Sequence, residues 1–486
     1  RRFTKVWNDS FLIRFDFKAK LALTLAGKTN SIMVCLNRET MAHRLIACEH
    51  CDYVHVENDI PAGSVACCIR CGSPLYAAEQ PRFDKPLALA FTALVLFVIA
   101  NIYPLLTFSM EGRAETNTLG SGVLTFWQEG FPFLAFMVAL TSIAAPMVVI
   151  AAHIYVLLPL SMGWTVPGVK RVWRVLAIIR PWSMLDVFLI GLLVALTKLT
   201  DFAQVIAGPA FFAVCCLIPT VLLMNITLDP RTVWRRIAPA GLRYLTEDDL
   251  TESRSNGSGQ NNAKGSDAGL MTCHTCSMVV AARNVDHGHC PRCGAVVHLR
   301  KARSLSRAFA LLLTAVVLYI PANVFPIMTV TYLGRAEADT ILSGVAVLVQ
   351  AGEWPIAIVV FTASILVPII KIVLLAWIYL ATWLGLSGPL RQRTRVYRIT
   401  ELIGRWSMVD VFMVSILAAL VKLGNIASIQ PGFGAVAFCG VVILTMLSAM
   451  AFDPRLIWDR AGMRRETLRQ KTLRSNSLKE TQGSPS

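Results

Sequence analysis

The chain has 486 residues and a formal net charge of +16, from 46 Lys and Arg against 30 Asp and Glu. Hydrophobic residues make up 55% and charged residues only 16%, which excludes an ordinary soluble protein and predicts several membrane spans. The basic residues stand beside the apolar runs, as the positive-inside rule predicts. We therefore favour a membrane protein whose basic flanks meet anionic lipid, and we expect no nucleic-acid partner.

Residues 1–40 lack an initial Met, and charged residues interrupt their apolar stretches. They contain no clean hydrophobic core of a signal peptide. Met33 and Met41 are alternative natural starts. We expect residues 1–40 to be an N-terminal extension that is either native or foreign to the natural protein, and we base no prediction of the fold on it.

Eight of the 13 cysteines form four C-x-x-C pairs in two groups. Two thiolates at this spacing reach one ion from a tight turn, and a second pair completes a tetrahedral site. Each group therefore predicts a zinc ribbon, over residues 41–80 and 271–300. We predict two structural zinc ions per chain, with iron in rubredoxin-like ribbons as the alternative. The predicted ligands are Cys48, Cys51, Cys68, Cys71, Cys273, Cys276, Cys290 and Cys293.

Some details of the ribbons stay open. Cys67 stands beside Cys68 and could replace it as a ligand. Gly72 and Gly294 follow the last Cys of each group and suit the positive φ that such a metal knuckle often needs. Nearby histidines could compete as ligands, although we expect most to be solvated: His50, His55, His274, His287 and His289.

Four apolar runs follow each ribbon, near or above the roughly 20 residues of a spanning helix. The first four cover 87–109, 131–160, 184–207 and 209–228, and the second four cover 308–330, 354–384, 408–429 and 433–452. Pro146 and Pro368 supply matching kink sites in the two longest runs. We predict an all-α polytopic membrane protein with two tandem four-helix transmembrane modules, at 81–236 and 301–459, each preceded by a small zinc ribbon.

The two modules are copies of one unit. Asn101-Ile-Tyr-Pro104 matches Asn323-Val-Phe-Pro326, and Asp229-Pro230-Arg231 matches Asp453-Pro454-Arg455. An even number of spans per copy makes this a parallel repeat. Residues 237–270 are predicted to be a flexible linker, and 460–486 a disordered basic tail. Lys and Arg gather on the ribbon side of the spans, so both termini and both ribbons should be cytoplasmic.

One motif occurs in both modules, as Trp182-Ser-Met-Leu-Asp186-Val-Phe188 and Trp406-Ser-Met-Val-Asp410-Val-Phe412, and runs on to Lys198 and Lys422. Charges inside a span are costly and are functional candidates by default. The Asp and Lys of one motif are too far apart to pair, with about 18 Å of helix rise between them. Lys371 lies at a depth similar to that of Asp410, whereas the first module has Val149 there. We predict a buried Asp410–Lys371 pair, with Ser364 and Ser407 nearby.

Simpler interpretations of these residues stay open. Asp186 and Asp410 could only stabilise a helix N-terminus, and Lys198 and Lys422 could reach the membrane interface. Asn101 and Asn323 could only satisfy backbone freed by the following prolines. No nucleophilic triad or Walker motif is present in the sequence, so we do not expect an enzyme.

The duplicated order of C-x-x-C pairs, N-x-x-P, W-S-M-x-D-V-F and D-P-R resembles the paraquat-inducible protein A family, over nearly all of residues 48–458. The resemblance implies a multi-pass protein of the bacterial inner membrane that works with a periplasmic MCE-domain partner. It further implies a role in intermembrane lipid transport, in which phospholipid is loaded onto or unloaded from that partner. Two rival hypotheses are a rubredoxin-like redox protein of the stress response and a passive membrane anchor or scaffold for the partner.

Overall fold

The computed structural model describes residues 33–35, 44–58, 60–61, 64–77, 83–110, 113–164, 166–200, 204–238, 242, 244–245, 269–281, 288–332, 335–350, 352, 354–386, 388–404, 408–420 and 427–463. The chain forms two compact units. The first contains Arg1–Phe91, Ile154–Val172 and Pro219–Leu299, and the second contains Thr92–His153, Trp173–Ile218 and Arg300–Ser486. Most of the predicted linker and of the tail lies outside the described residues.

Short hairpins build the two ribbons within the first unit. The first ribbon contains β2 (Leu45–Ala47), β3 (Val54–Val56), β4 (Val65–Cys67) and β5 (Pro74–Ala77), with β1 (Met33–Cys35) parallel to β4. The second contains β9 (Leu270–Thr272) and β10 (Val279–Ala281). Apolar side chains of β2, β3, β9 and β10 form one core with Leu245. Two ribbons far apart in the sequence therefore fold as one body, because each alone has little apolar surface to bury.

The first module begins with α3 (Asp84–Ile102), then strands β6 (Leu106–Met110) and β7 (Arg113–Asn117). Helices α4 (Ser121–Gln128), α5 (Pro132–Val138), η1 (Ala139–Ala144) and α6 (Ala145–Met162) follow. Next come α7 (Val169–Ile179), η2 (Arg180–Trp182), α8 (Leu185–Thr200), β8 (Gln204–Ala207), α9 (Pro209–Thr227) and α10 (Pro230–Ile237).

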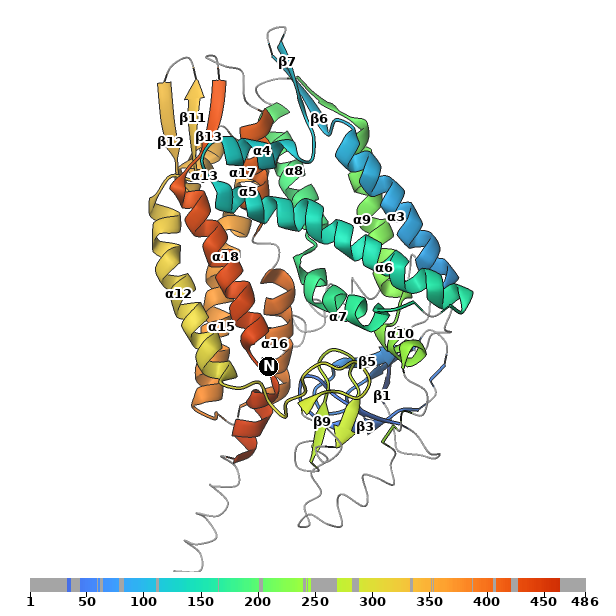
Figure 1. Ribbon diagram of the computed structural model, residues 1–486. Helices are drawn as coiled ribbons and strands as arrows, with labels where there is room; N and C mark the ends of the chain where they lie inside the picture. The colour runs from blue at the N-terminus through green and yellow to red at the C-terminus, as the bar shows by residue number, and fades with distance from the viewer. Residues whose placement is uncertain are drawn as a thin grey trace, which may run out of the picture. The chain divides into compact units, whose positions relative to one another are not determined.

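The second module repeats this order. It contains α12 (Ser304–Val324), β11 (Met328–Tyr332), β12 (Arg335–Asp339), α13 (Ile341–Gln350), α14 (Trp354–Phe361), η5 (Thr362–Leu366) and α15 (Val367–Trp383). It continues with α16 (Leu390–Ile403), α17 (Val409–Leu420), β13 (Ala427–Pro431) and α18 (Phe433–Ala451). Helices α12, α15 and α18 run side by side, with strands β11 to β13 at one end and α16 near the other (Figure 1).

Seven helical segments of the described residues are long and apolar enough to span a membrane: Asp84–Ile102, Pro132–Met162, Val169–Leu196, Pro209–Thr227, Ser304–Val324, Thr362–Trp383 and Phe433–Ala451. The eighth predicted run, 408–429, begins as α17, but residues 421–426 lie outside the described residues. The predicted fold class of two tandem helical modules with two ribbons is confirmed.

The predicted ends of four runs were wrong, because each run closes with a strand rather than a helix. Strand β6 lies between β7 and β8, and β11 lies between β12 and β13, all antiparallel. An apolar run cannot by itself distinguish the end of a helix from a short strand. The backbone is tight beside each sheet: a Cβ on Gly208 would lie 2.1 Å from Pro104 O, and one on Gly432 would lie 2.2 Å from Pro326 O.

Both long spans contain a π-helical turn directly before the region of the predicted kink. These turns are η1, next to Pro146, and η5, next to Pro368. A π turn widens the helix and leaves carbonyls without their usual α-helical partners. In the first module the carbonyl of Thr141 accepts a hydrogen bond from the backbone of Met184, at 3.3 Å. The π turn thus fixes the start of the motif helix α8.

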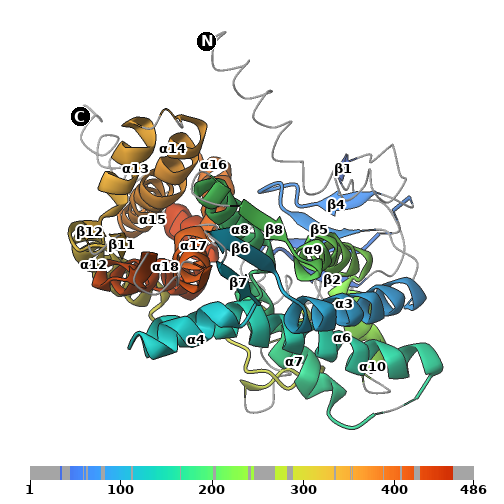
Figure 2. The ribbon, with the colours of Figure 1, turned by 90° about the horizontal axis from the view of Figure 1, so that it is seen from above.

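The two motif helices, α8 and α17, pack against each other (Figure 2). The rings of Phe188 and Phe412 meet edge to face with centroids 5.5 Å apart. The close approach requires Gly191, because a Cβ there would lie 3.0 Å from both Val409 O and Phe412 Cβ. The duplicated W-S-M-x-D-V-F elements therefore form the contact between the two modules.

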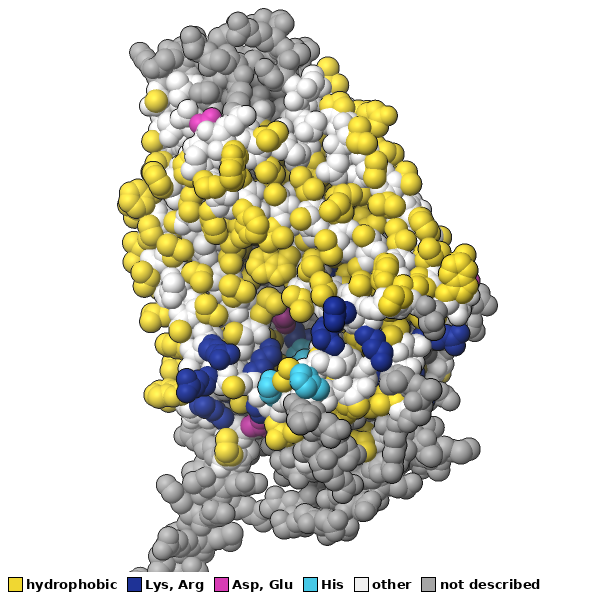
Figure 3. All heavy atoms as spheres, in the orientation of Figure 1, with side chains coloured by type: hydrophobic (Ala, Val, Ile, Leu, Met, Phe, Trp, Pro, Cys, Tyr) yellow, Lys and Arg dark blue, Asp and Glu magenta, His cyan; other side chains and the backbone are white. Residues whose placement is uncertain are grey.

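Helix α12 carries the surface pattern of a lipid-facing span. Apolar side chains are exposed along its length, among them Phe309, Leu313, Val317 and Val324. Its start is basic, with Arg303 and Arg307 exposed. Figure 3 shows the same change on this face, from apolar side chains to a band of Lys and Arg. An apolar flank with a basic boundary is the pattern that anionic head groups favour.

Candidate functional site: two metal centres and a buried polar site

The eight predicted cysteine ligands form two buried quartets, Cys48, Cys51, Cys68 and Cys71, and Cys273, Cys276, Cys290 and Cys293. Within each quartet all ligand sulfurs lie within 4.8 Å of one another. Across the two C-x-x-C pairs, the Sγ–Sγ distances are 3.5 Å for both contacts in the first quartet and 3.5 and 3.6 Å in the second. A tetrahedral ion with metal–sulfur bonds of about 2.3 Å separates its sulfurs by about 3.8 Å. The quartets therefore fit one such ion each.

Each C-x-x-C pair forms the same knuckle. The backbone N–H of the residue after the second Cys donates to the carbonyl of the first, at 2.8–2.9 Å, from Asp52, Gly72, Ser277 and Gly294. These four residues all have a positive φ, between 55° and 74°. The prediction that Gly72 and Gly294 supply positive φ is confirmed. Asp52 and Ser277 also have a left-handed backbone conformation, although they carry side chains. This conformation is strained for residues other than Gly.

The structure resolves which neighbouring residues belong to the quartets. Cys68, not Cys67, is in the first quartet. His55 is buried and its Nε2 lies 3.2 Å from Cys68 Sγ, so it hydrogen-bonds to a ligand sulfur rather than replacing it. Such outer partners orient and stabilise a metal-bound thiolate. His289 is exposed, His50 and His274 are not in either quartet, and His287 lies outside the described residues.

In the second C-x-x-C pair of each quartet, hydrogen bonds lower the pKa of the last thiol, which favours its thiolate form. Hydrogen bonds from Cys48 and Cys51 lower the pKa of Cys71 to about 6. Hydrogen bonds from Cys273 and Cys276 lower the pKa of Cys293 to about 7. A thiolate is the form that binds metal. Because every ligand position is a protein thiolate, the centres suit a structural ion and leave no open position for a substrate.

Lys371 is the buried cation predicted in the second module. It lies on α15 within a membrane-spanning helix, is only 3% exposed, and donates through Nζ to the carbonyl of Gly404 at 3.3 Å. Gly404 leaves the room for it, because a Cβ at that position would lie 2.8 Å from Lys371 Nζ. The ammonium group of Lys371 therefore contacts the backbone two residues before Trp406, where the second motif begins.

Ser364 lies in η5, close to Lys371 in the chain, and is buried. Its Oγ has no hydrogen-bond partner among the described residues, and Ser364 lines a pocket together with Met328, Gly344 and Met413. The matching residue of the first module, Ser142, donates to Val138 O at 2.6 Å. A buried hydroxyl without a partner costs free energy, so it marks a place where a ligand or another polar group could bind.

The remaining predicted residues are less informative. Asn101 donates to Phe97 O at 2.7 Å and Asn323 to Tyr319 O at 2.8 Å, which is the local backbone contact that the simpler interpretation expects. Asp186 is half-buried in the first turn of α8. The side chains of Asp410 and Lys198, and all of Ser407 and Lys422, lie outside the described residues, so the Asp410–Lys371 pair stays a prediction.

Sequence reasoning missed two contacts that buried polar side chains make with glycines. Gly404 was not singled out, although its lack of a side chain is what admits Lys371. Ser415 of α17 is buried against Gly122 of α4, where a Cβ on Gly122 would lie 2.2 Å from Ser415 Oγ. A serine in the middle of an apolar span was the available signal for the second contact.

These features define a multi-pass membrane protein with two four-cysteine groups that can each hold a metal ion, and a duplicated helical module. The chain matches the family described as paraquat-inducible protein A over residues 83–238 and 305–462. It belongs to that family.

Curated relatives cover almost the whole chain. The intermembrane transport protein PqiA of Escherichia coli K12 is 33% identical over 436 residues, which are 88% of this chain and 98% of that relative. The lipophilic envelope-spanning tunnel protein A of the same strain is 30% identical over 416 residues, 85% of this chain and 90% of that relative. A probable intermembrane transport protein of Haemophilus influenzae is 25% identical over 425 residues, 85% of this chain and 96% of that relative. No solved structure matches the chain.

Proposed function

We propose that this protein is an inner-membrane component of an intermembrane lipid transport system. In this proposal it loads phospholipid onto, or unloads it from, a periplasmic MCE-domain partner, and both termini and both ribbons face the cytoplasm. The names of two relatives, which describe intermembrane transport and an envelope-spanning tunnel, support a transport role. The basic start of α12 supports the cytoplasmic placement of that end.

The observation that carries the proposal is the burial of Lys371 inside a membrane span. A Lys within a span is costly and is kept where it meets a counter-charge or a ligand. A phospholipid head group carries a phosphate, which an ammonium group can neutralise. Ser364, seven residues before Lys371 on the same long span, adds a hydroxyl without a partner among the described residues. It lines a pocket together with Met413 and Asp339, and Lys371 is not among the lining residues of that pocket. We propose that Lys371, Ser364, Ser407 and Asp410 form the polar site that a head group contacts.

The other predicted intramembrane residues take supporting roles in this proposal. Lys422 and Lys198 neutralise head groups at the other end of the motif helices. Asp186 stands where Asp410 stands in the second module, without a matching lysine. Asn101 and Asn323 fix the helix ends before Pro104 and Pro326.

The metal in each quartet is proposed to be zinc, with a structural role. The donor set of four thiolates suits zinc and also suits iron in a rubredoxin-like centre. Iron would favour a redox role, and it would make the purified protein coloured and redox-active. Metal analysis of protein purified without chelator therefore separates the transport and redox hypotheses.

The transport hypothesis is tested by Lys371→Ala in a strain that depends on this protein for outer-membrane integrity. We expect loss of integrity while the protein still reaches the membrane, and less phospholipid bound to the purified protein. Lys85→Ala is the matched control, because Lys85 is exposed at the start of α3. Full integrity with Lys371→Ala would place the transport site elsewhere. Full integrity with unchanged bound lipid would favour a passive scaffold for the partner.

The proposed Asp410–Lys371 pair has its own test. Asp410→Asn should also abolish function, because it removes the counter-charge of a buried cation. Replacing both residues with apolar ones should restore abundance without restoring activity. Asp186→Asn should be milder, since the first module has Val149 at the place of Lys371.

A further inference from the structure

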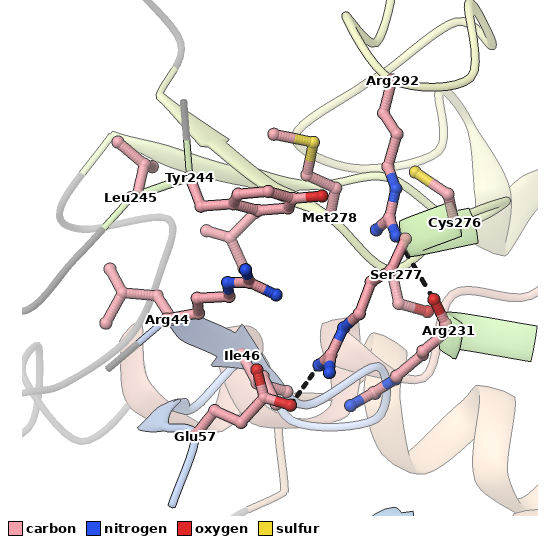
Figure 4. A pocket seen from close by; sticks show the side chains of 13 residues that line it. Arg44, Ile46, Glu57, Arg231, Tyr244, Leu245, Cys276, Ser277, Met278 and Arg292 are labelled. Carbon is pink, nitrogen blue, oxygen red and sulfur yellow. Dashed lines mark hydrogen bonds and ion pairs between the residues drawn. The ribbon is translucent and has the colours of Figure 1, made fainter. Parts of the chain in front are cut away.

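The first unit contains a pocket that neither the metal centres nor the transport proposal uses. The first ribbon, the second ribbon, helix α10 and the segment at 244–245 all contribute to its lining (Figure 4). Its open space, including the mouth, measures about 420 Å³. Four arginines line it, Arg44, Arg231, Arg235 and Arg292, and Glu57 is the single acidic residue among its described lining residues.

The pocket is held in shape by contacts of its own side chains. Arg292 is 5% exposed and is fixed to α10, where Nε donates to Trp234 O at 3.1 Å and Nη2 to Arg231 O at 3.3 Å. The ring of Tyr244 lies 4.4 Å from the guanidinium of Arg44 and 5.8 Å from that of Arg292. An aromatic face attracts a nearby cation, so the ring of Tyr244 favours the observed positions of these two guanidinium groups.

Arg231 is the side chain whose contacts are incomplete. Its Nη1 is buried and has no hydrogen-bond partner within the described part of the chain. The matching arginine of the second copy, Arg455, is instead paired, since its Nε donates to Asp453 Oδ1 at 3.1 Å. A buried guanidinium N–H without an acceptor is costly, and a bound anion would supply the acceptor. In Figure 4, the side chains of Arg231 and Arg44 extend from opposite sides toward the middle of the pocket.

The charge of the pocket indicates the kind of ligand. Arg235 forms an ion pair with Glu57, which leaves Arg44, Arg231 and Arg292 without an acidic neighbour among the described lining residues. The planar fork of a guanidinium matches the oxygens of phosphate and binds them in pairs. We propose that this pocket, hereafter the ribbon pocket, binds a phosphate group, either a free phosphate or the phosphodiester of a lipid head group.

The position of α10 allows both sources of phosphate. Helix α9, a membrane-spanning candidate, ends at Thr227, and α10 begins at Pro230. Arg231 is therefore only a few residues from the membrane end of a span, within reach of head groups. The ribbon side of the pocket is equally suited to a soluble phosphate. The inference goes beyond lipid transport and does not depend on it.

The test measures binding of inorganic phosphate to the full-length, metal-loaded protein in uncharged detergent by calorimetry. Arg231→Gln should weaken binding by about tenfold or more, the loss expected for one charge-assisted hydrogen bond. Arg44→Gln, at an exposed position, should also weaken it. Arg236→Gln is the matched control, because it removes the same charge from α10 at an exposed residue that does not line the pocket. Glu57→Gln should tighten binding.

A second arm identifies the source. The protein is placed in nanodiscs of phosphatidylcholine alone or of phosphatidylcholine with phosphatidylglycerol. If a lipid head group occupies the ribbon pocket, the anionic discs should block inorganic phosphate, and Arg231→Gln should abolish that competition. A phosphate affinity in both discs equal to that in uncharged detergent assigns a soluble phosphate instead, whereas equally weakened binding in both discs assigns a lipid phosphodiester, because phosphatidylcholine also carries one. Absence of phosphate binding in detergent, or equal binding by the Arg231→Gln and Arg236→Gln proteins with unchanged thermal stability, would overturn the proposal.

Discussion

The D-P-R motif occurs in both copies, but its aspartates are predicted to respond very differently to Asp→Asn substitution. Asp453 and Arg455 form an ion pair of 3.1 Å, with side chains that are 0% and 2% exposed. Asp453 also accepts from the backbone N–H of Lys301. Asp229 is half-buried and caps α10, accepting from the backbone of Arg231 at 3.1 Å.

Asp453→Asn removes the carboxylate charge that pairs with the buried guanidinium of Arg455. Breaking a buried pair in this way costs roughly 3–5 kcal/mol. Asp229→Asn keeps a good helix cap, because Asn caps about as well as Asp, so its cost should be below about 0.5 kcal/mol. For a chain of 486 residues, an unfolding entropy of roughly 2 cal/mol/K per residue makes 1 kcal/mol correspond to about 1 °C of melting temperature. Asp453→Asn should therefore lower the melting temperature of detergent-purified protein by about 3–5 °C, and Asp229→Asn by less than about 0.5 °C.

The pH dependence provides a second measurement. Burial alone would raise the pKa of Asp453, but the charge and hydrogen bonds of Arg455 and the N–H of Lys301 hold it below its ordinary value. A carboxyl with a lowered folded-state pKa stabilises the protein above its unfolded pKa and loses that effect as the pH falls through the folded pKa. The difference between wild type and Asp453→Asn should thus be constant from pH 6 to pH 8. Equal melting of the two Asn variants would refute this reasoning.

Three further predictions concern the metal, the topology and the packing. Metal analysis should find two zinc ions per chain, and Cys48→Ser or Cys273→Ser should lower folded yield; stoichiometric iron would contradict the zinc assignment. Cysteine labelling at Glu115 and Glu337 should be periplasmic and at Ser258, which lies outside the described residues, cytoplasmic; the reverse would refute the orientation. Gly122→Val should destabilise the protein by roughly 1–3 kcal/mol through a clash with Ser415. Ser343-Gly344 of the second module matches Ser121-Gly122 of the first. Gly344→Val should be close to neutral in thermal melts, because nothing lies within 4 Å of the added Cβ.

Short sequence patterns predicted the features that depend on residues close together in the chain. The spacing of the Cys pairs predicted both quartets. The lengths of the apolar runs predicted eight spans, and the described residues contain seven helical segments long and apolar enough to be spans. The positive φ at Gly72 and Gly294 also follows from the knuckle itself. Each of these features depends either on residues that are close in sequence or on the apolar composition of one continuous run.

Contacts between distant segments could not be predicted in the same way. The packing of α8 on α17 depends on Gly191 meeting Val409, residues more than 200 positions apart. The sheets at the ends of the spans depend on β8 and β13 pairing with strands that precede them by two spans. The room for Lys371 depends on the missing side chain of Gly404. Sequence periodicity carries no information on such long-range partners.

The D-P-R segments of the two copies make different contacts: one binds within its own module, and the other binds the second ribbon. In the second copy, Arg455 pairs with Asp453 and Trp458 donates to Thr394 at 3.0 Å, so the segment after the last span closes its own module. In the first copy, Trp234 donates to Thr275 of the second ribbon at 3.2 Å, and Arg231 faces the ribbon pocket. The D-P-R segment of one copy thus binds the ribbon of the next. Because α10 begins at Pro230, directly after the candidate membrane span that ends at Thr227, the first copy's D-P-R segment connects the end of that span to the ribbon pocket.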